Sequence, residues 1–202
     1  MNRQEYRIAI YQILADALKE PSTEPGEEPQ ESGDFLFAAF EALQYPIAPE
    51  KYQLWSTFPS DINLLKQNYC LSFIYPVESR VLPVESIYRQ WTLDNTSEMP
   101  FAKEKGYLMS DFALHMQALY AQYQLSIPAE YTSMPDHLCL ELEFCAFLIE
   151  NVSREEQAIF INEHLNWVDE LYLDAVKQDI PIFYRQVIQV IAEFLKNEMQ
   201  SS

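Results

Sequence analysis

Ionisable residues interrupt an apolar stretch at positions 134–149, which reads MPDHLCLELEFCAFLI. Asp136, His137 and Glu141 are the members of this stretch that could bind or orient a charged group. His137 and Glu141 lie four positions apart, so their side chains share one face if the stretch is helical. Two interpretations follow. The stretch is a core helix whose polar residues are caps and solvated neighbours, or it is an apolar wall that carries a polar binding spot.

Enzyme chemistry finds little support in the residue types and their spacing. The three glycines leave no glycine-rich phosphate loop, and no Gly-x-Ser-x-Gly nucleophile motif occurs. Asp136, His137 and His164 could serve a helical metal-dependent hydrolase, with Glu141 as a further ligand. No His-x-x-x-His or Glu-x-x-His spacing supports such a metal site. The sequence therefore predicts no enzyme, no metal and no cofactor, and the hydrolase is kept as the alternative.

A second segment with chemical potential is the proline-interrupted stretch 75–91, YPVESRVLPVESIYRQW. It is unusually aromatic for a loop, since loops are normally polar. Tyr75, Tyr88 and Trp91 either pin this loop to the core or line a binding wall.

Apolar periodicity predicts helices along the whole chain. Leu138, Leu142, Cys145 and Ile149 recur at four, three and four positions, which is the spacing of one buried helix face. Ser153 begins a capping box, the pattern that opens a helix. The expected helices cover 2–19, 34–44, 61–74, 109–125, 136–150, 153–177 and 182–199. In the second of these, we expect Phe35, Phe37, Phe40 and Leu43 to face inward.

Few glycines and few β-branched runs indicate an all-α protein, and a chain of 202 residues fits one domain covering 1–202. Between the first two helices, residues 20–33 (EPSTEPGEEPQESG) hold three prolines among five glutamates. Such a composition does not bury enough apolar surface to pack. We expect a mobile, acidic, proline-rich loop there.

The formal net charge of −18 limits the classes of partner. It argues against nucleic acid, which requires a basic face, and against an anionic membrane surface. It favours the attraction of cationic partners. The three cysteines form no Cys-x-x-Cys pair and indicate reduced, cytosolic thiols. We expect neither a signal peptide nor a membrane span, because no apolar run approaches about 20 residues.

Four short motifs resemble those of the TorD/DmsD/NarJ family of redox-enzyme maturation chaperones. PDHLCLELEF resembles the Pro-Asp-His element that opens a core helix in that family, although here Pro135 directly precedes Asp136. NYCLSF and LPVESIYRQW resemble an aromatic helix end and a Pro-Pro-x-x-Ser-hydrophobic-Tyr loop, with Leu82 in place of the first proline. EHLNWV resembles a Glu-His-hydrophobic-x-Trp run. The resemblance spans roughly residues 60–195.

This resemblance implies a single-domain helical bundle of the TorD-like type and a cytoplasmic, non-enzymatic chaperone. Its partner would be the catalytic subunit of a molybdenum-dependent, DMSO reductase-type oxidoreductase, or the twin-arginine leader of that subunit. No nucleic-acid binding or membrane insertion is expected, and the protein would be a monomer or a domain-swapped dimer.

A twin-arginine leader carries two guanidinium groups followed by an apolar stretch, so a receptor needs an apolar groove with acidic groups at one end. His137 is expected to orient Asp136 or to titrate near neutrality. The expected groove residues are Tyr69, Phe73, Pro83, Val84, Ser86, Tyr88 and Pro135, and the expected polar contacts are Glu85, Asp136, His137 and Glu141, with Glu143 as a further acid.

Overall fold

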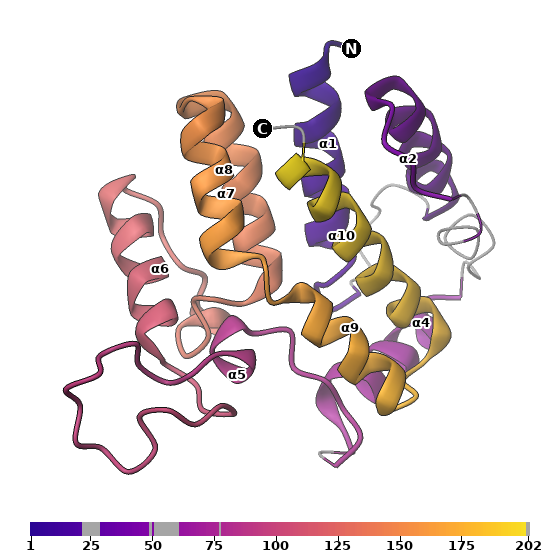
Figure 1. Ribbon diagram of the computed structural model, residues 1–202. Coiled ribbons are helices and arrows are strands. Elements are labelled where there is room, and N and C mark those ends of the chain that lie inside the picture. The colour runs from indigo at the N-terminus through magenta and orange to yellow at the C-terminus, as the bar shows by residue number, and fades with distance from the viewer. Residues whose placement is uncertain (22–28, 49, 51–60, 77, 201–202) are drawn as a thin grey trace.

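Helices supply the regular structure of this chain. The computed structural model describes residues 1–21, 29–48, 50, 61–76 and 78–200 (Figure 1). Within those ranges no strand occurs, and the β-type contact is an isolated antiparallel bridge between Val84 and His137. The all-α class expected from the sequence is confirmed.

The helix bounds follow the apolar periodicity closely. The helices are α1 (Arg3–Asp16), α2 (Pro29–Leu43), α4 (Ile62–Tyr69), α5 (Glu85–Tyr88), α6 (Asp111–Gln122), α7 (Leu138–Asn151), α8 (Arg154–His164), α9 (Val168–Lys177) and α10 (Ile182–Gln200). A π-helical turn, Cys70–Ile74, extends α4, and a 3-10 turn, Ala129–Tyr131, precedes α7. In the described part of the chain, no helix is long and apolar enough to cross a membrane.

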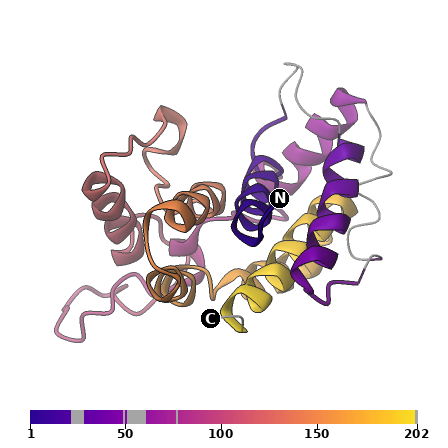
Figure 2. The ribbon, with the colours of Figure 1, turned by 90° about the horizontal axis from the view of Figure 1, so that it is seen from above.

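The helix α1 lies at the centre of the packing. It contacts α7 most extensively and also packs on α2, while α10 packs on α8, α9 and α4. Seen from above, α1 lies between α7 on one side and α2 and α10 on the other (Figure 2). Tyr11 of α1 meets Phe194 of α10 edge to face, with ring centroids 4.8 Å apart, and both side chains are fully buried. Because these contacts join helices from both ends of the sequence, we propose that the chain is one domain.

A buried ion pair ties the two ends of the chain together. The guanidinium of Arg7 on α1 lies 2.6 Å from a carboxylate oxygen of Glu198 on α10. Tyr11 and Tyr45 donate their hydroxyls to the same carboxylate, at 3.2 and 2.5 Å. Burial alone would raise the pKa of Glu198, but the hydrogen bonds and charge of Arg7 hold that pKa below its ordinary value.

The two largest differences from the predicted helices concern α8 and α2. The expected helix 153–177 is broken into α8 and α9. The helix α8 ends at His164, because the backbone carbonyl of this residue accepts the indole N–H of Trp167 at 2.7 Å. The capping box of Ser153 at the start of α8 is present as predicted. The second difference is α2, which begins at Pro29, so the last five residues of the predicted loop 20–33 are helical. Proline suits a first helical turn because its φ is fixed and it lacks an N–H.

One prediction about side-chain orientation is wrong, and the predicted mobility of the loop stays a prediction. Phe37, expected to face inward, is 41% exposed, whereas Leu36 and Phe40 of the same helix are buried. Residues 22–28 of the expected mobile loop lie outside the described residues.

Candidate functional site

The segment before α5 and the segment before α7 meet in an extended contact that we call the α5–α7 joint, formed by Pro83–Ser86 and Pro135–Leu138. The backbone N–H of Leu138 donates to the carbonyl of Pro83 at 2.8 Å, and the N–H of Glu85 donates to the carbonyl of Asp136 at 3.0 Å. These bonds hold residue 137 in an extended conformation, so α7 begins at Leu138 rather than at residue 136. The joint unites two motifs that lie about 50 residues apart in the sequence.

Asp136 holds the joint together through its side chain. Its Oδ2 accepts hydrogen bonds from the backbone N–H of Ser86, at 2.7 Å, and from the Ser86 hydroxyl. The Ser86 Oγ also lies 2.7 Å from the Oγ of Ser110. Burial raises the pKa of Asp136 above its ordinary value in spite of the hydrogen bonds from Ser86. Its second oxygen, Oδ1, is buried and has no hydrogen-bond partner among the described residues.

Beside the joint lies a set of three ionisable side chains that we call the buried acidic cluster: Glu85, Glu141 and His164. The Nδ1 of His164 lies 2.8 Å from Oε2 of Glu85, and all three residues are at most 1% exposed. Neither carboxyl oxygen of Glu141 has a hydrogen-bond partner among the residues that the structure describes. Burial, together with the negative charges of Glu85 and Asp136, raises the pKa of Glu141 well above its ordinary value. Glu141 therefore does not offer a ready surface charge.

His137 behaves differently from the sequence-based expectation. Its Nδ1 accepts the backbone N–H of Cys139 at 3.3 Å, so this ring caps α7 instead of orienting Asp136. The ring packs beside Tyr131, with centroids 5.0 Å apart. Burial lowers the pKa of His137 to about 4, so the residue is neutral at neutral pH and does not titrate there as we expected.

The three aromatic residues of the expected groove pack into the core at two separate places. Tyr69 and Phe73 both meet the ring of Tyr184 on α10, at centroid distances of 5.9 and 5.0 Å. The ring of Tyr88 stacks on that of Trp167, with centroids 5.2 Å apart, and the Tyr88 hydroxyl donates to the carboxylate of Asp174. None of the eleven expected contact residues exposes more than a tenth of its surface: Tyr69, Phe73, Pro83, Val84, Glu85, Ser86, Tyr88, Pro135, Asp136, His137 and Glu141.

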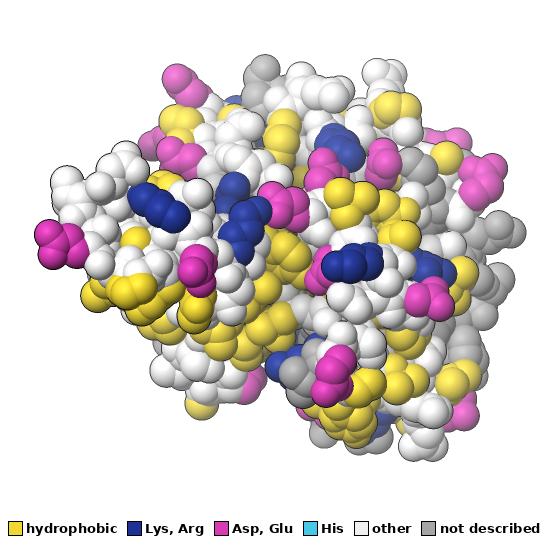
Figure 3. Space-filling model, turned by 60° about the horizontal axis from the view of Figure 1, so that its bottom comes forward, with side chains coloured by type: hydrophobic (Ala, Val, Ile, Leu, Met, Phe, Trp, Pro, Cys, Tyr) yellow, Lys and Arg dark blue, Asp and Glu magenta, His cyan; other side chains and the backbone are white. Residues whose placement is uncertain are grey.

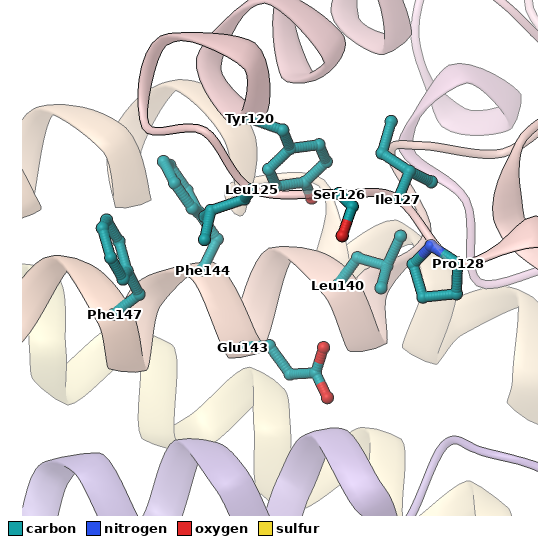
Figure 4. Close-up of a pocket in the computed structure, with 9 residues that line it drawn as sticks. All are labelled: Tyr120, Leu125, Ser126, Ile127, Pro128, Leu140, Glu143, Phe144 and Phe147. Atoms are coloured by element: carbon teal, nitrogen blue, oxygen red, sulfur yellow. The ribbon is translucent and has the colours of Figure 1, made fainter.

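An apolar cavity that the sequence did not indicate lies between the end of α6 and α7 (Figure 4). Its volume is about 210 Å³. The lining is formed by Tyr120, Leu125, Ser126, Ile127, Pro128, Leu140, Glu143, Phe144 and Phe147. We call this space the α6–α7 pocket. Most of its lining is aliphatic or aromatic, as in sites for apolar ligand groups.

One carboxylate borders the α6–α7 pocket. Glu143 is on the side of α7 that faces α1, where its Oε1 lies 2.5 Å from the ammonium of Lys19. The side chains of Glu143 and Lys19 are 43% and 38% exposed, so solvent screens the pair and a competing cation can reach it. A second link leads from the pocket to the joint, since the hydroxyl of Tyr120 donates to the carbonyl of Pro135 at 3.2 Å.

Comparison with known proteins decides the family. The model of a family described as nitrate reductase delta subunit matches residues 41–172, well over half of the chain. The chain belongs to this family. This family is the TorD/DmsD/NarJ group of redox-enzyme maturation chaperones, whose motifs the four sequence motifs resemble.

Three relatives of this maturation-chaperone family bear the name chaperone protein TorD. The protein from Shewanella piezotolerans is 24% identical over 138 residues, and that from Aliivibrio fischeri is 28% identical over 148. Each match covers 67% of this chain but only 61% and 63% of the relative, so the chain spans less than two thirds of these two proteins. The protein from Photobacterium profundum is 24% identical over 212 residues, covering 94% of this chain and 91% of the relative.

A solved structure shares the fold. A crystal structure described as a redox enzyme maturation protein from Archaeoglobus fulgidus superposes with a TM-score of 0.54 over 97% of this chain and 94% of its own. Sequence identity is 18%, so this likeness concerns the fold alone.

Relatives named as chaperones agree with the expectation that the protein is not an enzyme. The alternative of a hydrolase built on Asp136, His137 and His164 is therefore set aside. The geometry agrees, because His137 contacts Cys139 and Tyr131, and among the described residues the metal-compatible group is Glu85, Glu141 and His164.

Proposed function

We propose that this protein is a cytoplasmic chaperone for the catalytic subunit of a molybdenum-dependent, DMSO reductase-type oxidoreductase. It binds the twin-arginine leader of that subunit and retains the subunit until the cofactor has been inserted. Family membership supports the chaperone class. The observation that carries leader binding is the α6–α7 pocket, an apolar space on the helix of the Pro-Asp-His motif with a carboxylate at its border.

The pocket suits the two parts of such a leader. An apolar side chain of the leader fills the space between Leu140, Phe144 and Phe147, and burial of that side chain supplies most of the binding free energy. An arginine beside it pairs with Glu143 in place of Lys19. The formal charge of −18 attracts the cationic leader and speeds its encounter with the protein.

In this proposal, the residues that the sequence predicts to contact the leader act in a second step. They are buried, so an arginine reaches Asp136 only when the α5–α7 joint opens. Tyr120 lines the pocket and also bonds the carbonyl of Pro135, so a ligand that moves Tyr120 also perturbs the joint. We propose that the leader enters at the pocket and that the joint responds.

A second surface suits the folded oxidoreductase. The segment from residue 93 into α6 exposes the large apolar side chains of Leu93, Met99, Tyr107, Leu108 and Leu114. Hydrophobic side chains are visible among scattered charges over the lower face of the molecule (Figure 3). Apolar patches of this kind mark protein–protein contact sites. We propose that the oxidoreductase docks there, on a monomer or a domain-swapped dimer of the chaperone.

The test is calorimetric titration with a synthetic twin-arginine leader from a reductase encoded beside the gene for this protein. Ser126→Trp places an indole in the pocket from an exposed position, so it blocks the space without removing a core contact. Ser133→Trp adds the same side chain at an exposed serine that does not line the pocket. We expect at least a tenfold loss of affinity for Ser126→Trp and parental affinity for Ser133→Trp. Equal affinities for the two variants would remove the pocket from the mechanism.

A further inference from the structure

The α5–α7 joint and the end of α8 surround the buried acidic cluster, and this cluster has the composition of a metal site. One ligand atom from each of Glu85, Glu141 and His164 lies within 4.8 Å of the other two. Two carboxylates and an imidazole are a donor set for divalent transition-metal ions such as Zn²⁺ and Mn²⁺. The three side chains come from α5, α7 and α8, which converge at the lower end of α7 (Figure 1).

An acidic cluster alone does not make a site, but Glu141 supplies an independent observation. Its side chain is fully buried, and within the described part of the chain neither of its carboxyl oxygens lies at hydrogen-bond distance and geometry from a partner. Buried polar atoms without partners are rare in folded proteins, and a bound ion is one of their recognised explanations. Asp136 adds a further buried oxygen, Oδ1, for which the described ranges of the chain supply no hydrogen-bond partner.

Glu85 and His164 each have a second polar atom, pointing away from the cluster, that contacts a further side chain. Glu85 offers Oε2 to the cluster while its Oε1 accepts the guanidinium of Arg89 at 3.2 Å. His164 offers Nδ1, while its Nε2 lies 2.8 Å from Nδ1 of His115. The imidazole of His164 also stacks on Phe160, with centroids 5.0 Å apart. Metal-binding histidines and carboxylates are normally oriented in this way, with one atom on the metal and the other on a fixed partner.

We propose that Glu85 Oε2, Glu141 and His164 Nδ1 bind one divalent transition-metal ion, with His115 and Arg89 as positioning residues. The site needs small movements only, because ligand atoms around such an ion stand about 3–3.5 Å apart at the usual bond lengths of about 2.0–2.2 Å. Access is through His115, which is exposed and lies directly outside His164. The ion links α5, α7 and α8, so its role is structural. This inference differs from the sequence-based expectation of no metal, and it does not depend on leader binding.

The test is titration of chelator-treated, reduced protein with Zn²⁺ and, in parallel, Mn²⁺, followed by calorimetry and elemental analysis. We expect one equivalent of Zn²⁺, and we expect the melting temperature to rise with the ion. Glu141→Gln should weaken binding at least tenfold, and because the amide has nearly the same shape as the carboxyl group that it replaces, this variant should fold like the parent. His115→Gln should weaken binding by about tenfold. Glu155→Gln, at an exposed position of α8, should bind like the parent.

Two results would overturn the proposal. One is the lack of saturable binding of either ion by the folded parent. The other is binding that Glu141→Gln does not weaken. Zinc can also bind to thiolates, and Cys70 is partly accessible. Co²⁺ distinguishes the two cases, because thiolate ligation gives an intense near-ultraviolet absorption band, whereas a site of carboxylates and imidazole does not. A strong band of that kind in the parent would assign the bound ion to cysteine and refute the site.

Discussion

Replacing Asp136 with alanine should destabilise the protein by about 1–3 kcal/mol. In the folded protein, Asp136 Oδ2 is the acceptor for the backbone N–H of Ser86 at 2.7 Å and for the Ser86 hydroxyl. After the substitution, the hydroxyl can still turn toward Ser110, 2.7 Å away, but the N–H of Ser86 loses its acceptor in a fully buried place. A buried donor without a partner costs about 1–3 kcal/mol.

Asp136→Asn is the milder change, because the amide oxygen can accept both hydrogen bonds of Ser86. Its NH₂ group then occupies the place of Oδ1, which has no hydrogen-bond partner in the part of the chain that the structure describes. We expect a loss of about 1 kcal/mol or less, since burial already disfavours the carboxylate that the amide replaces. The two variants therefore separate the loss of the acceptor from the loss of the charge.

Urea unfolding of parent, Asp136→Ala, Asp136→Asn and the exposed control Glu155→Gln measures these differences. Leader titration with Asp136→Asn then tests direct contact. If an arginine of the leader meets Asp136, affinity should fall by roughly 1.5–3 kcal/mol beyond any change in stability. Stability of Asp136→Ala within about 0.5 kcal/mol of the parent would refute the role of Asp136 in the joint, because surface changes produce differences of that size.

Two further substitutions test buried ionisable side chains, His137 and Glu198. Because His137 has a pKa of about 4 in the folded protein against an ordinary 6.5, the stability that it contributes is complete above pH 6.5 and is lost as pH falls toward 4. The expected loss in the free energy of unfolding is about 3 kcal/mol. His137→Asn keeps a hydrogen-bond acceptor at the helix cap, so its stability, measured by urea unfolding, should change correspondingly less between pH 7 and 4. Glu198→Gln removes the charge that faces Arg7 and should cost about 3–5 kcal/mol, observed as a lower melting temperature, while a change below about 1 kcal/mol would contradict the importance of this ion pair.

The fold followed from local patterns to a large extent. The spacing of Leu138, Leu142, Cys145 and Ile149 predicted α7, and the four side chains are buried as that spacing requires. The capping box at Ser153 fixed the start of α8. The end of α8 was missed because it depends on contacts of His164, whose carbonyl accepts the indole N–H of Trp167 and whose ring contacts the distant residue Glu85. Periodicity within one segment contains no information about such a partner.

The site was less predictable for the same reason. The sequence indicated that Asp136 and Ser86 matter, and the structure places them in direct contact. It did not indicate that they face each other instead of solvent, because a polar residue on an apolar helix has the same pattern in both cases. Phe144 and Phe147 of α7 line the α6–α7 pocket, and an apolar helix pattern does not distinguish the wall of a pocket from a buried core face. The loop residues that complete this pocket carry no motif.

The most direct measurement of the central claim is the calorimetric titration of the parent with twin-arginine leaders at two salt concentrations. Our account predicts saturable binding by a leader of a neighbouring molybdenum-dependent reductase, weaker at high salt because the acidic field is screened. It predicts a further loss of about 1 kcal/mol for Glu143→Gln, the size expected of a half-exposed ion pair. No binding of any such leader by the folded parent would contradict leader recognition, whatever the fold.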